Sequence, residues 1–417
     1  PLDSAIFLSS NHCKGCHGSD PSGYAMHTSD GTDVNIYDDW RATMMANSAK
    51  DPFWRAKVSH EVLINPAHAD DIENSCTSCH APLGHYNAYF KGDPHYTISD
   101  LLVDTVGLDG VSCVGCHQMT AGNGNTFSGE IEYDTTGNLY GPFEDVFEGP
   151  MQLYTGYEPV QGEHITESEV CASCHTLIVN TVDLAGNYTG GTFVEQATYH
   201  EWLNSRYSVQ DITCQECHMP RLDEPIVTAT GYLALDGQFP YGQHELAGAN
   251  TFMLKLMKEN RAALGIEARA EDFDSTLAAT YRMLQQKTLD SDLQFVNEAN
   301  DTAYFELTLM NKAGHKFPSG YPSRIAYVEF RVEDEAGNTM FHSGKLDSNN
   351  ALMDINPNYE PHYDIIRAED QVQVYQVVNA DVNGDFSTVL ERGAMTLKDN
   401  RLPPQGFTKS HYTIDTV

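Results

Sequence analysis

Ten cysteines stand in five pairs that all share one local pattern. Two residues separate the members of each pair, and a histidine follows each second cysteine directly. No cysteine is left over. Two thiols three positions apart can reach the two vinyl groups on one edge of a porphyrin, and the next histidine is then placed to bind the iron. The pattern therefore predicts covalent c-type haem attachment, five times.

The predicted sites follow directly from this spacing. The thioether cysteines are Cys13, Cys16, Cys76, Cys79, Cys113, Cys116, Cys171, Cys174, Cys214 and Cys217. The proximal iron ligands are His17, His80, His117, His175 and His218. We refer to these as the first to fifth motifs, and the predicted cofactors are five c-type haems with their irons.

Zinc and disulfide chemistry are the competing interpretations of paired cysteines. A zinc ribbon combines two Cys-x-x-Cys pairs in one four-ligand site, whereas five is an odd number of pairs. Neither a ribbon nor a disulfide framework requires a histidine after every pair. Haem attachment accounts for every cysteine and for the five histidines, so we favour it.

Each iron needs a second axial ligand, and thirteen further histidines are available. His164 lies seven residues before Cys171, where a short helix would direct it over a neighbouring haem. His68 and His85 flank the second motif and compete as ligands. His12 and His27 bracket the first motif, close to the N-terminus, so they are free to reach an iron of another subunit. We interpret the later histidines His342, His362 and His411 as surface residues.

Composition limits the partners and the compartment. Acidic residues outnumber basic ones 59 to 24, a net charge of −35, which disfavours nucleic acid and anionic membranes and suits cationic partners. No apolar run is long enough to span a membrane, and the first residue is Pro rather than Met, as expected of a processed chain. Because thioether attachment of haem takes place outside the cytoplasm, we expect an extracellular or cell-surface protein, with the periplasm as second choice.

The periodicity of the chain predicts three consecutive regions. Residues 1–225 contain the motifs among Gly-, Asn- and Pro-rich stretches, which predicts a pentahaem domain with short helices and little regular structure. Residues 226–292 form a helical connecting region, with two amphipathic patterns separated by Gly265. Residues 293–417 alternate apolar and polar side chains, which predicts a small antiparallel β-sandwich-like domain without its own haem motif.

Segments at and beyond the motifs resemble a group of bacterial multihaem c-type cytochromes with a C-terminal sheet domain. The similar segments are Asp38–Trp54, Cys76–His85, Gly110–His117, Cys214–Pro220 and Gly314–Arg324. The resemblance implies His315 as a distal ligand and adds His244, in a family-like segment, and His60, after the Trp54 segment. Relatives often have a histidine near Met44 and Met45, which makes this pair a rival ligand, although core packing is the favoured interpretation.

The architecture also resembles that of outer-surface cytochromes that polymerise into extracellular filaments. This second resemblance implies that other copies of the chain are partners, joined head to tail, with one continuous path of haems through the polymer. We predict electron transfer through a chain of five haems, between redox partner proteins or extracellular acceptors. The alternative is a multihaem reductase of a small oxyanion or nitrogen compound, which would require one iron with an open sixth position.

Overall fold

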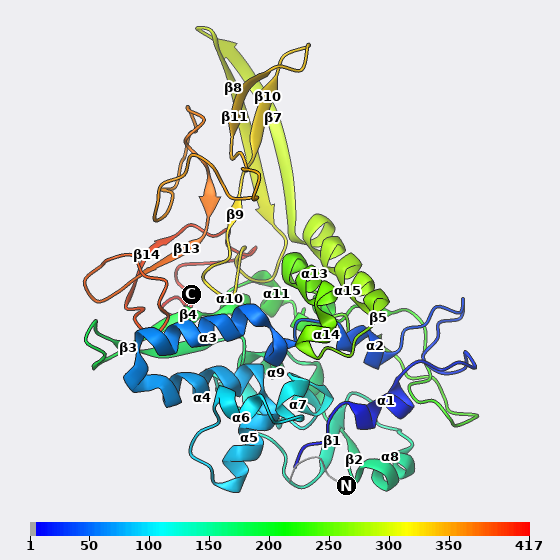
Figure 1. The fold of residues 1–417 in the computed structure, drawn as a ribbon. Coiled ribbons are helices and arrows are strands. Elements are labelled where there is room, and N and C mark those ends of the chain that lie inside the picture. The colour runs from blue at the N-terminus through cyan, green and yellow to red at the C-terminus, as the bar shows by residue number, and fades with distance from the viewer. Residues whose placement is uncertain (1–5) are drawn as a thin grey trace. The chain divides into compact units, whose positions relative to one another are not determined.

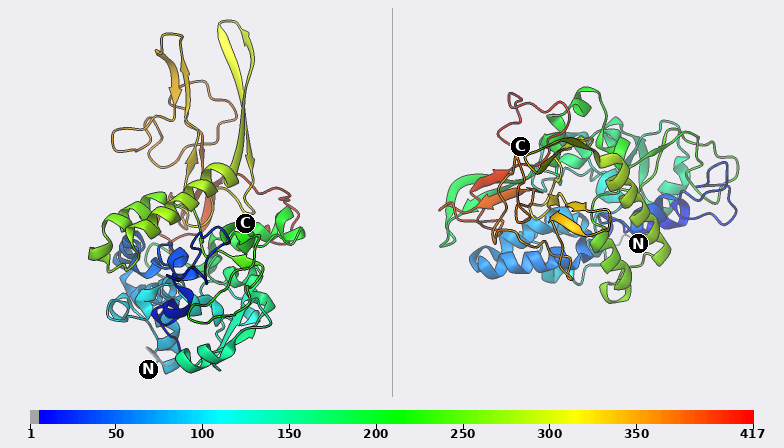
Figure 2. Two further views of the ribbon diagram at one scale, coloured as in Figure 1. Left: turned by 90° about the vertical axis from the view of Figure 1, so that its right-hand side faces the viewer. Right: turned by 90° about the horizontal axis from the view of Figure 1, so that it is seen from above.

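The chain folds into two compact units that are both discontinuous in sequence. A computed structural model describes residues 6–417. One unit, the motif unit, contains residues 1–174 and 210–287, and the other, the sheet unit, contains residues 175–209 and 288–417. Figures 1 and 2 show the course of the chain. The division into regions 1–225, 226–292 and 293–417 remains a prediction. The two compact units do not coincide with these regions, because each unit contains two separate segments of the chain.

Short helices are the main regular elements of the motif unit. The α-helices are α1 (Asn11–His17), α2 (Ile36–Arg41), α3 (Pro52–Ile64), α4 (Ala69–His80), α5 (Pro82–Lys91), α6 (Ile98–Leu101), α7 (Cys113–His117), α8 (Glu148–Thr155), α9 (Glu169–Ala172), α12 (Cys214–His218), α13 (Thr251–Glu259), α14 (Arg261–Leu264) and α15 (Ala270–Arg282). Short 3-10 turns are η1 (Ser48–Lys50), η2 (Pro66–His68), η3 (Gly107–Asp109), η4 (Ala121–Asn125) and η5 (Glu163–Thr166). Its small sheets pair β1 (Asn138–Gly141) with β2 (Glu158–Gln161) in parallel and β5 (Arg221–Leu222) with β6 (Tyr241–Gly242) antiparallel.

The core of the motif unit is divided into several apolar clusters rather than one. The largest cluster joins α5 and α7 through Leu83, Tyr86 and Val114, with Phe7 and Tyr133. A second cluster joins α13 to α15. Gly265 ends α14 in the left-handed region, with φ of 65°, which a residue without Cβ adopts without strain. Helices therefore occupy the region where two helical patterns were predicted.

The sheet unit consists of two-stranded sheets. Its strands are β3 (Leu177–Val182), β4 (Tyr188–Gln196), β7 (Leu289–Ala299), β8 (Thr302–Asn311), β9 (Ala326–Tyr327), β10 (Phe330–Glu333), β11 (Thr339–Ser343), β12 (Val374–Tyr375), β13 (Val377–Ala380) and β14 (Met395–Asp399). The pairs are all antiparallel: β3 with β4, β7 with β8, β9 with β12, β10 with β11 and β13 with β14. The helices α10 (Thr198–Leu203) and α11 (Arg206–Val209) belong to the same unit, and the π-turn η6 (Met283–Thr288) ends at its boundary.

Residues between the fourth and fifth motifs join the sheet unit through long-range bonds. The Thr181 hydroxyl donates to the carbonyl of Gly393, and the Glu201 carboxylate binds Arg401. Local sequence patterns do not report such pairings, which explains why residues 175–209 were predicted to belong with the haem region.

Candidate haem sites

Helical geometry places the reactive groups of the motifs on one side. Helices α1, α4, α7 and α12 each end at the histidine of a motif, and α9 covers the start of the fourth motif. On a helix, residues at i, i+3 and i+4 share a face. The two thiols and the imidazole of a motif are therefore presented together, as attachment along one porphyrin edge requires.

Three of the proximal histidines are held in the tautomer that binds iron. The Nδ1 atoms of His17, His117 and His218 lie 2.8, 2.6 and 2.7 Å from the carbonyl oxygens of Thr228, Tyr140 and Ala247. Since a carbonyl oxygen only accepts, Nδ1 carries the proton and Nε2 keeps its lone pair. This outer hydrogen bond is typical of metal-binding histidines. The donor set therefore fits haem iron.

The Asp38–Trp54 segment supports two motifs at once. The indole N–H of Trp40 donates to the carbonyl of Val111, 3.0 Å away and two residues before Cys113. The ring of Trp54 stacks on His80, with centroids 4.7 Å apart and planes at 8°. Sequence reasoning singled out this segment only by resemblance. Its contacts indicate that the two indoles orient the second and third motifs.

His244 lies opposite His117 at a separation that suits two ligands of one iron. The ring centroids are 6.4 Å apart, and the planes are inclined by 24°. A separation of this order would allow both imidazoles to reach one shared metal ion through metal–nitrogen bonds of about 2.0–2.1 Å. The Nδ1 atom of His244 is 3.1 Å from the carbonyl oxygen of Gly242, so Nδ1 carries the proton and Nε2 keeps its lone pair, as in the three proximal histidines.

Two other candidates share this arrangement, and one differs. The Nδ1 atoms of His315 and His27 lie 2.9 and 2.8 Å from the carbonyl oxygens of Lys316 and Ala25. In His164, Nε2 is the engaged nitrogen, 2.9 Å from the carbonyl oxygen of Met119. To bind an iron, His164 would therefore have to use its Nδ1 atom or lose its hydrogen bond with Met119. His315 belongs to the sheet unit, whereas His27 and His164 belong to the motif unit.

The remaining candidates differ in exposure. The His60 side chain is 48% exposed, beside Glu61, whereas His68 is buried. The Nδ1 atom of His12 lies 3.4 Å from the Ser9 hydroxyl. Met44 packs against the apolar cluster of α13 and α15, which supports core packing for this residue.

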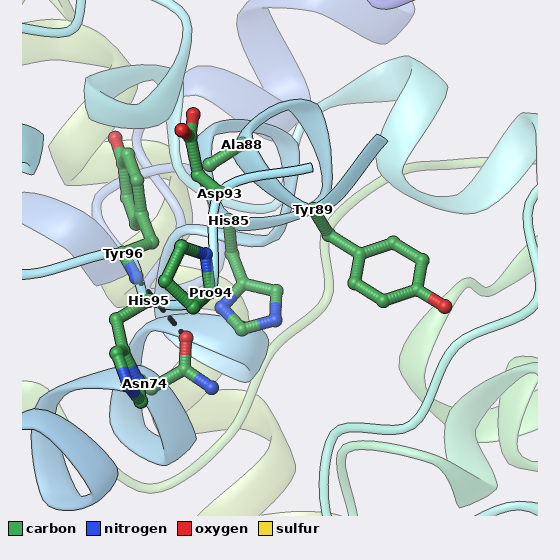
Figure 3. Close-up of a pocket in the computed structure, with 8 residues that line it drawn as sticks. All are labelled: Asn74, His85, Ala88, Tyr89, Asp93, Pro94, His95 and Tyr96. Carbon is green, nitrogen blue, oxygen red and sulfur yellow. Dashed lines mark hydrogen bonds between the residues drawn. The ribbon is translucent and has the colours of Figure 1, made fainter. Parts of the chain in front are cut away.

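His85 lines a small cavity after the second motif. Figure 3 shows the cavity, which is lined by Asn74, His85, Ala88, Tyr89, Asp93, Pro94, His95 and Tyr96. Its volume of about 30 Å³ accommodates water rather than a porphyrin. The Thr77 hydroxyl is 3.3 Å from Nδ1 of His85, and burial lowers the pKa of His85 to about 4, which keeps the imidazole neutral.

Cysteines of different motifs contact one another. The side chains of Cys13 and Cys113 lie side by side, as do those of Cys79 and Cys174 and those of Cys171 and Cys214. The pKa of the Cys174 thiol is raised by its contact with the Cys79 thiol, by burial and by other nearby thiols, among them Cys116 of the third motif. Cysteines are therefore side by side in the motif pairs first–third, second–fourth and fourth–fifth, and Cys116 of the third motif lies in the neighbourhood of Cys174 of the fourth. The fourth motif is thus near three others.

The thiols do not gather as zinc ligands would. Across residues 6–417, no three His, Cys, Asp or Glu side chains converge on a point that could hold a metal ion. Zinc sites in ribbons need four converging ligands. The arrangement instead repeats two thiols and one imidazole five times.

A solved structure has the same fold as this chain. The crystal structure of a penta-heme cytochrome c552 from Thermochromatium tepidum superposes with a TM-score of 0.58 and 17% sequence identity, covering 96% of this chain and 86% of that one. No protein-family model and no curated protein matches the sequence. The chain therefore has the fold of a multihaem c-type cytochrome and carries the attachment motifs that such a fold requires. In residues 6–417 no helix has the length and apolarity to cross a membrane.

Proposed function

We propose that this protein transfers electrons through five covalently attached c-type haems. The observation that carries the proposal is the contact between cysteines of different motifs, because each cysteine marks one edge of a haem. Haems whose attachment edges touch lie close enough to exchange electrons. The protein's contribution would be to position the rings and to tune each iron through its ligands and burial.

The contacts imply an order for the haems. The first would connect to the third, the third to the fourth, and the second and fifth would both connect to the fourth. The fourth haem would then be the junction of the path. The net charge of −35 favours the oxidised irons and so lowers their reduction potentials. An extracellular or cell-surface location would suit a carrier that passes electrons to an acceptor outside the cell. The periplasm is the second choice of location.

Haem content is the first test. The intact protein should exceed the mass of the 417-residue chain by five haems, because all ten cysteines lie in attachment motifs. Mass spectrometry of the purified holoprotein under denaturing conditions measures the covalent haems alone. A mass excess of fewer than five haems would contradict the proposal in its present form.

Ligation at His244 provides a second prediction. We expect His244→Ala to convert one haem from six-coordinate low-spin to five-coordinate high-spin, because His244 faces His117 across the separation of a bis-histidine site. Electron paramagnetic resonance of the oxidised protein measures this change. His362→Ala, at a side chain that is 46% exposed, is the matched control and should leave the spectrum unchanged. An unaltered spectrum for His244→Ala would remove this residue from the ligand set.

The same spectrum separates the carrier from the alternative reductase. A reductase needs an iron with an open sixth position, whereas a carrier has six-coordinate irons throughout. We expect only low-spin signals from the unmodified protein. A high-spin signal that responds to added nitrite would favour the reductase instead.

We further propose that copies of the chain assemble head to tail. His27 follows the first motif and is partly exposed, and its Nδ1 lies against a carbonyl oxygen, which keeps the lone pair on Nε2 for binding an iron of a neighbouring copy. A heterologous contact of this kind gives an open polymer unless it closes into a ring. Repulsion between copies of charge −35 opposes assembly, so salt should promote it.

Electron microscopy tests the assembly. We expect negative-stain images at moderate salt to show linear polymers, and His27→Ala to shorten or disperse them, whereas His95→Ala should not. His12→Ala tests the second histidine at this end in the same way. Dispersed particles from the unmodified protein, with every iron already six-coordinate, would leave no role for a borrowed histidine.

A further inference from the structure

The β7–β8 hairpin is unusually long for a sheet of only two strands. Its strands contain 11 and 10 residues, whereas a typical strand has about 5–6. Eleven extended residues span about 35 Å. Figures 1 and 2 show the hairpin in yellow as a narrow ribbon, near the shorter β10–β11 hairpin of the same unit. A two-stranded sheet of this kind is marginally stable unless one face is covered.

The register of the hairpin gives it one apolar face. Leu293 pairs with Leu307 and Phe295 with Phe305, and directly opposed residues point to the same side. The other face contains pairs such as Asp292 with Thr308 and Gln294 with Glu306. The two strands therefore alternate like strands that have one buried face and one solvated face.

The apolar face is nevertheless open to solvent. Phe305 contacts Phe330 of β10, with ring centroids 5.4 Å apart, so the neighbouring hairpin covers part of the face. Leu293, Phe295, Phe305 and Leu307 remain 53%, 60%, 41% and 39% exposed. Contiguous apolar side chains exposed to this degree are typical of an interaction site rather than of ordinary protein surface.

The edges of the hairpin offer hydrogen bonds to a further strand. In the described chain β7 and β8 pair only with each other, so each strand has one edge that no third strand occupies. Such edges bind extended peptide segments by adding a strand, with main-chain bonds providing affinity and alternate side chains providing specificity. The apolar face would receive every second side chain of the added strand.

Charge decides between the possible occupants. Residues 289–311 contain Asp290, Asp292, Glu298, Asp301 and Glu306 and no Lys, Arg or His. A second copy of this chain, with a net charge of −35, is a poor complement to such a surface. A cationic segment would be attracted to it and guided into register.

We propose that the β7–β8 hairpin is a docking site for a basic partner protein, which adds an extended segment of alternating apolar and Lys or Arg residues to the edge of the hairpin. The apolar side chains of that segment cover Leu293, Phe295 and Leu307, and its cations face the carboxylates. The proposal is independent of the haems and of the assembly described above.

The test uses the holoprotein and fluorescent model peptides. The probes are a ten-residue peptide of alternating Lys and Val, the corresponding Glu and Val peptide, and the Lys peptide N-methylated at alternate residues so that its pairing edge lacks N–H donors. Fluorescence anisotropy gives their affinities at low and high salt. We expect the Lys peptide to bind, more weakly at high salt, and the other two peptides to bind poorly.

Two hairpin variants and one control make the result specific. Phe295→Ser should weaken binding of the Lys peptide by about tenfold, the loss of one well-packed apolar anchor. Asp292→Asn, which leaves the apolar face intact, should weaken it less and flatten the salt dependence. Leu153→Ser, at an apolar residue that is 77% exposed on α8, should change nothing.

Three outcomes would overturn the proposal. Equal binding of the N-methylated peptide would exclude strand addition. Affinity unaffected by Phe295→Ser would show nonspecific attraction to an acidic protein. Sedimentation that reveals a dimer dispersed by Phe295→Ser would assign the face to a second copy of the chain instead.

Discussion

Removing the fourth haem should interrupt electron exchange more than removing any other haem. In the double variant Cys171→Ala/Cys174→Ala, we expect the second and fifth haems to lose rapid equilibration with the first and third. The reason is the position of the fourth motif, whose cysteines contact Cys79 of the second motif and Cys214 of the fifth and lie near Cys116 of the third. Without the junction, each gap must be crossed in a longer step.

The matched control is the corresponding double variant at the first motif. Because Cys13 lies beside Cys113, at one end of the proposed order, Cys13→Ala/Cys16→Ala should remove one terminal haem and leave exchange among the other four intact. Flash photoreduction followed by absorbance measures the redistribution of electrons, and intact mass confirms that each variant lacks one haem. Equal loss of exchange in both variants would contradict the proposed order.

Removal of a buried carboxylate in the sheet unit should have the largest effect on stability. Glu201 is fully buried and pairs with Arg401 at 2.8 Å, and it also accepts hydrogen bonds from the Ser319 hydroxyl at 2.6 Å and the Lys316 amide at 3.1 Å. Glu201→Ala would leave the Ser319 hydroxyl and the Lys316 amide without this acceptor, whereas Arg401 would keep its second carboxylate partner, Asp399, at 2.8 Å. A buried donor that loses its acceptor costs about 1–3 kcal/mol, so we expect the loss of two to cost several kcal/mol.

Two further variants calibrate this prediction. Glu201→Gln keeps an acceptor for the hydroxyl and the amide, so it should cost less than Glu201→Ala. Glu369→Ala breaks a partly exposed pair with Lys345 in the same unit and should destabilise the protein much less than Glu201→Ala, because solvent screens such a pair. Urea denaturation followed by circular dichroism measures the free energy of unfolding. Similar losses for Glu201→Ala and Glu369→Ala would show that burial of the Glu201 network contributes little.

The Glu201 network also bears on His315. Glu201 binds the amide of Lys316, and the carbonyl of Lys316 faces Nδ1 of His315 at 2.9 Å. The same carboxylate therefore holds Lys316, the residue whose carbonyl orients this candidate ligand. None of this is visible in the sequence, where Glu201 and Lys316 are more than a hundred positions apart.

The sequence by itself was enough to predict the attachment sites. Thioether linkage and proximal ligation depend on residues no more than four positions apart, so the order Cys13, Cys16, His17 and its four repetitions predict them without reference to the fold. The helices α13 and α15 were equally predictable, because a repeat of three to four residues records which face of a helix is buried.

Only the tertiary structure decided which motifs are neighbours and which distant side chains meet. Cys13 meets Cys113, His117 faces His244, and Glu201 meets Arg401, each pair across a hundred residues or more. Such contacts depend on how separate segments pack, and a single sequence records no signal of that packing. The β7–β8 hairpin shows the same limit: its alternation predicted strands, whereas the exposure of its apolar face depends on what the rest of the unit leaves uncovered.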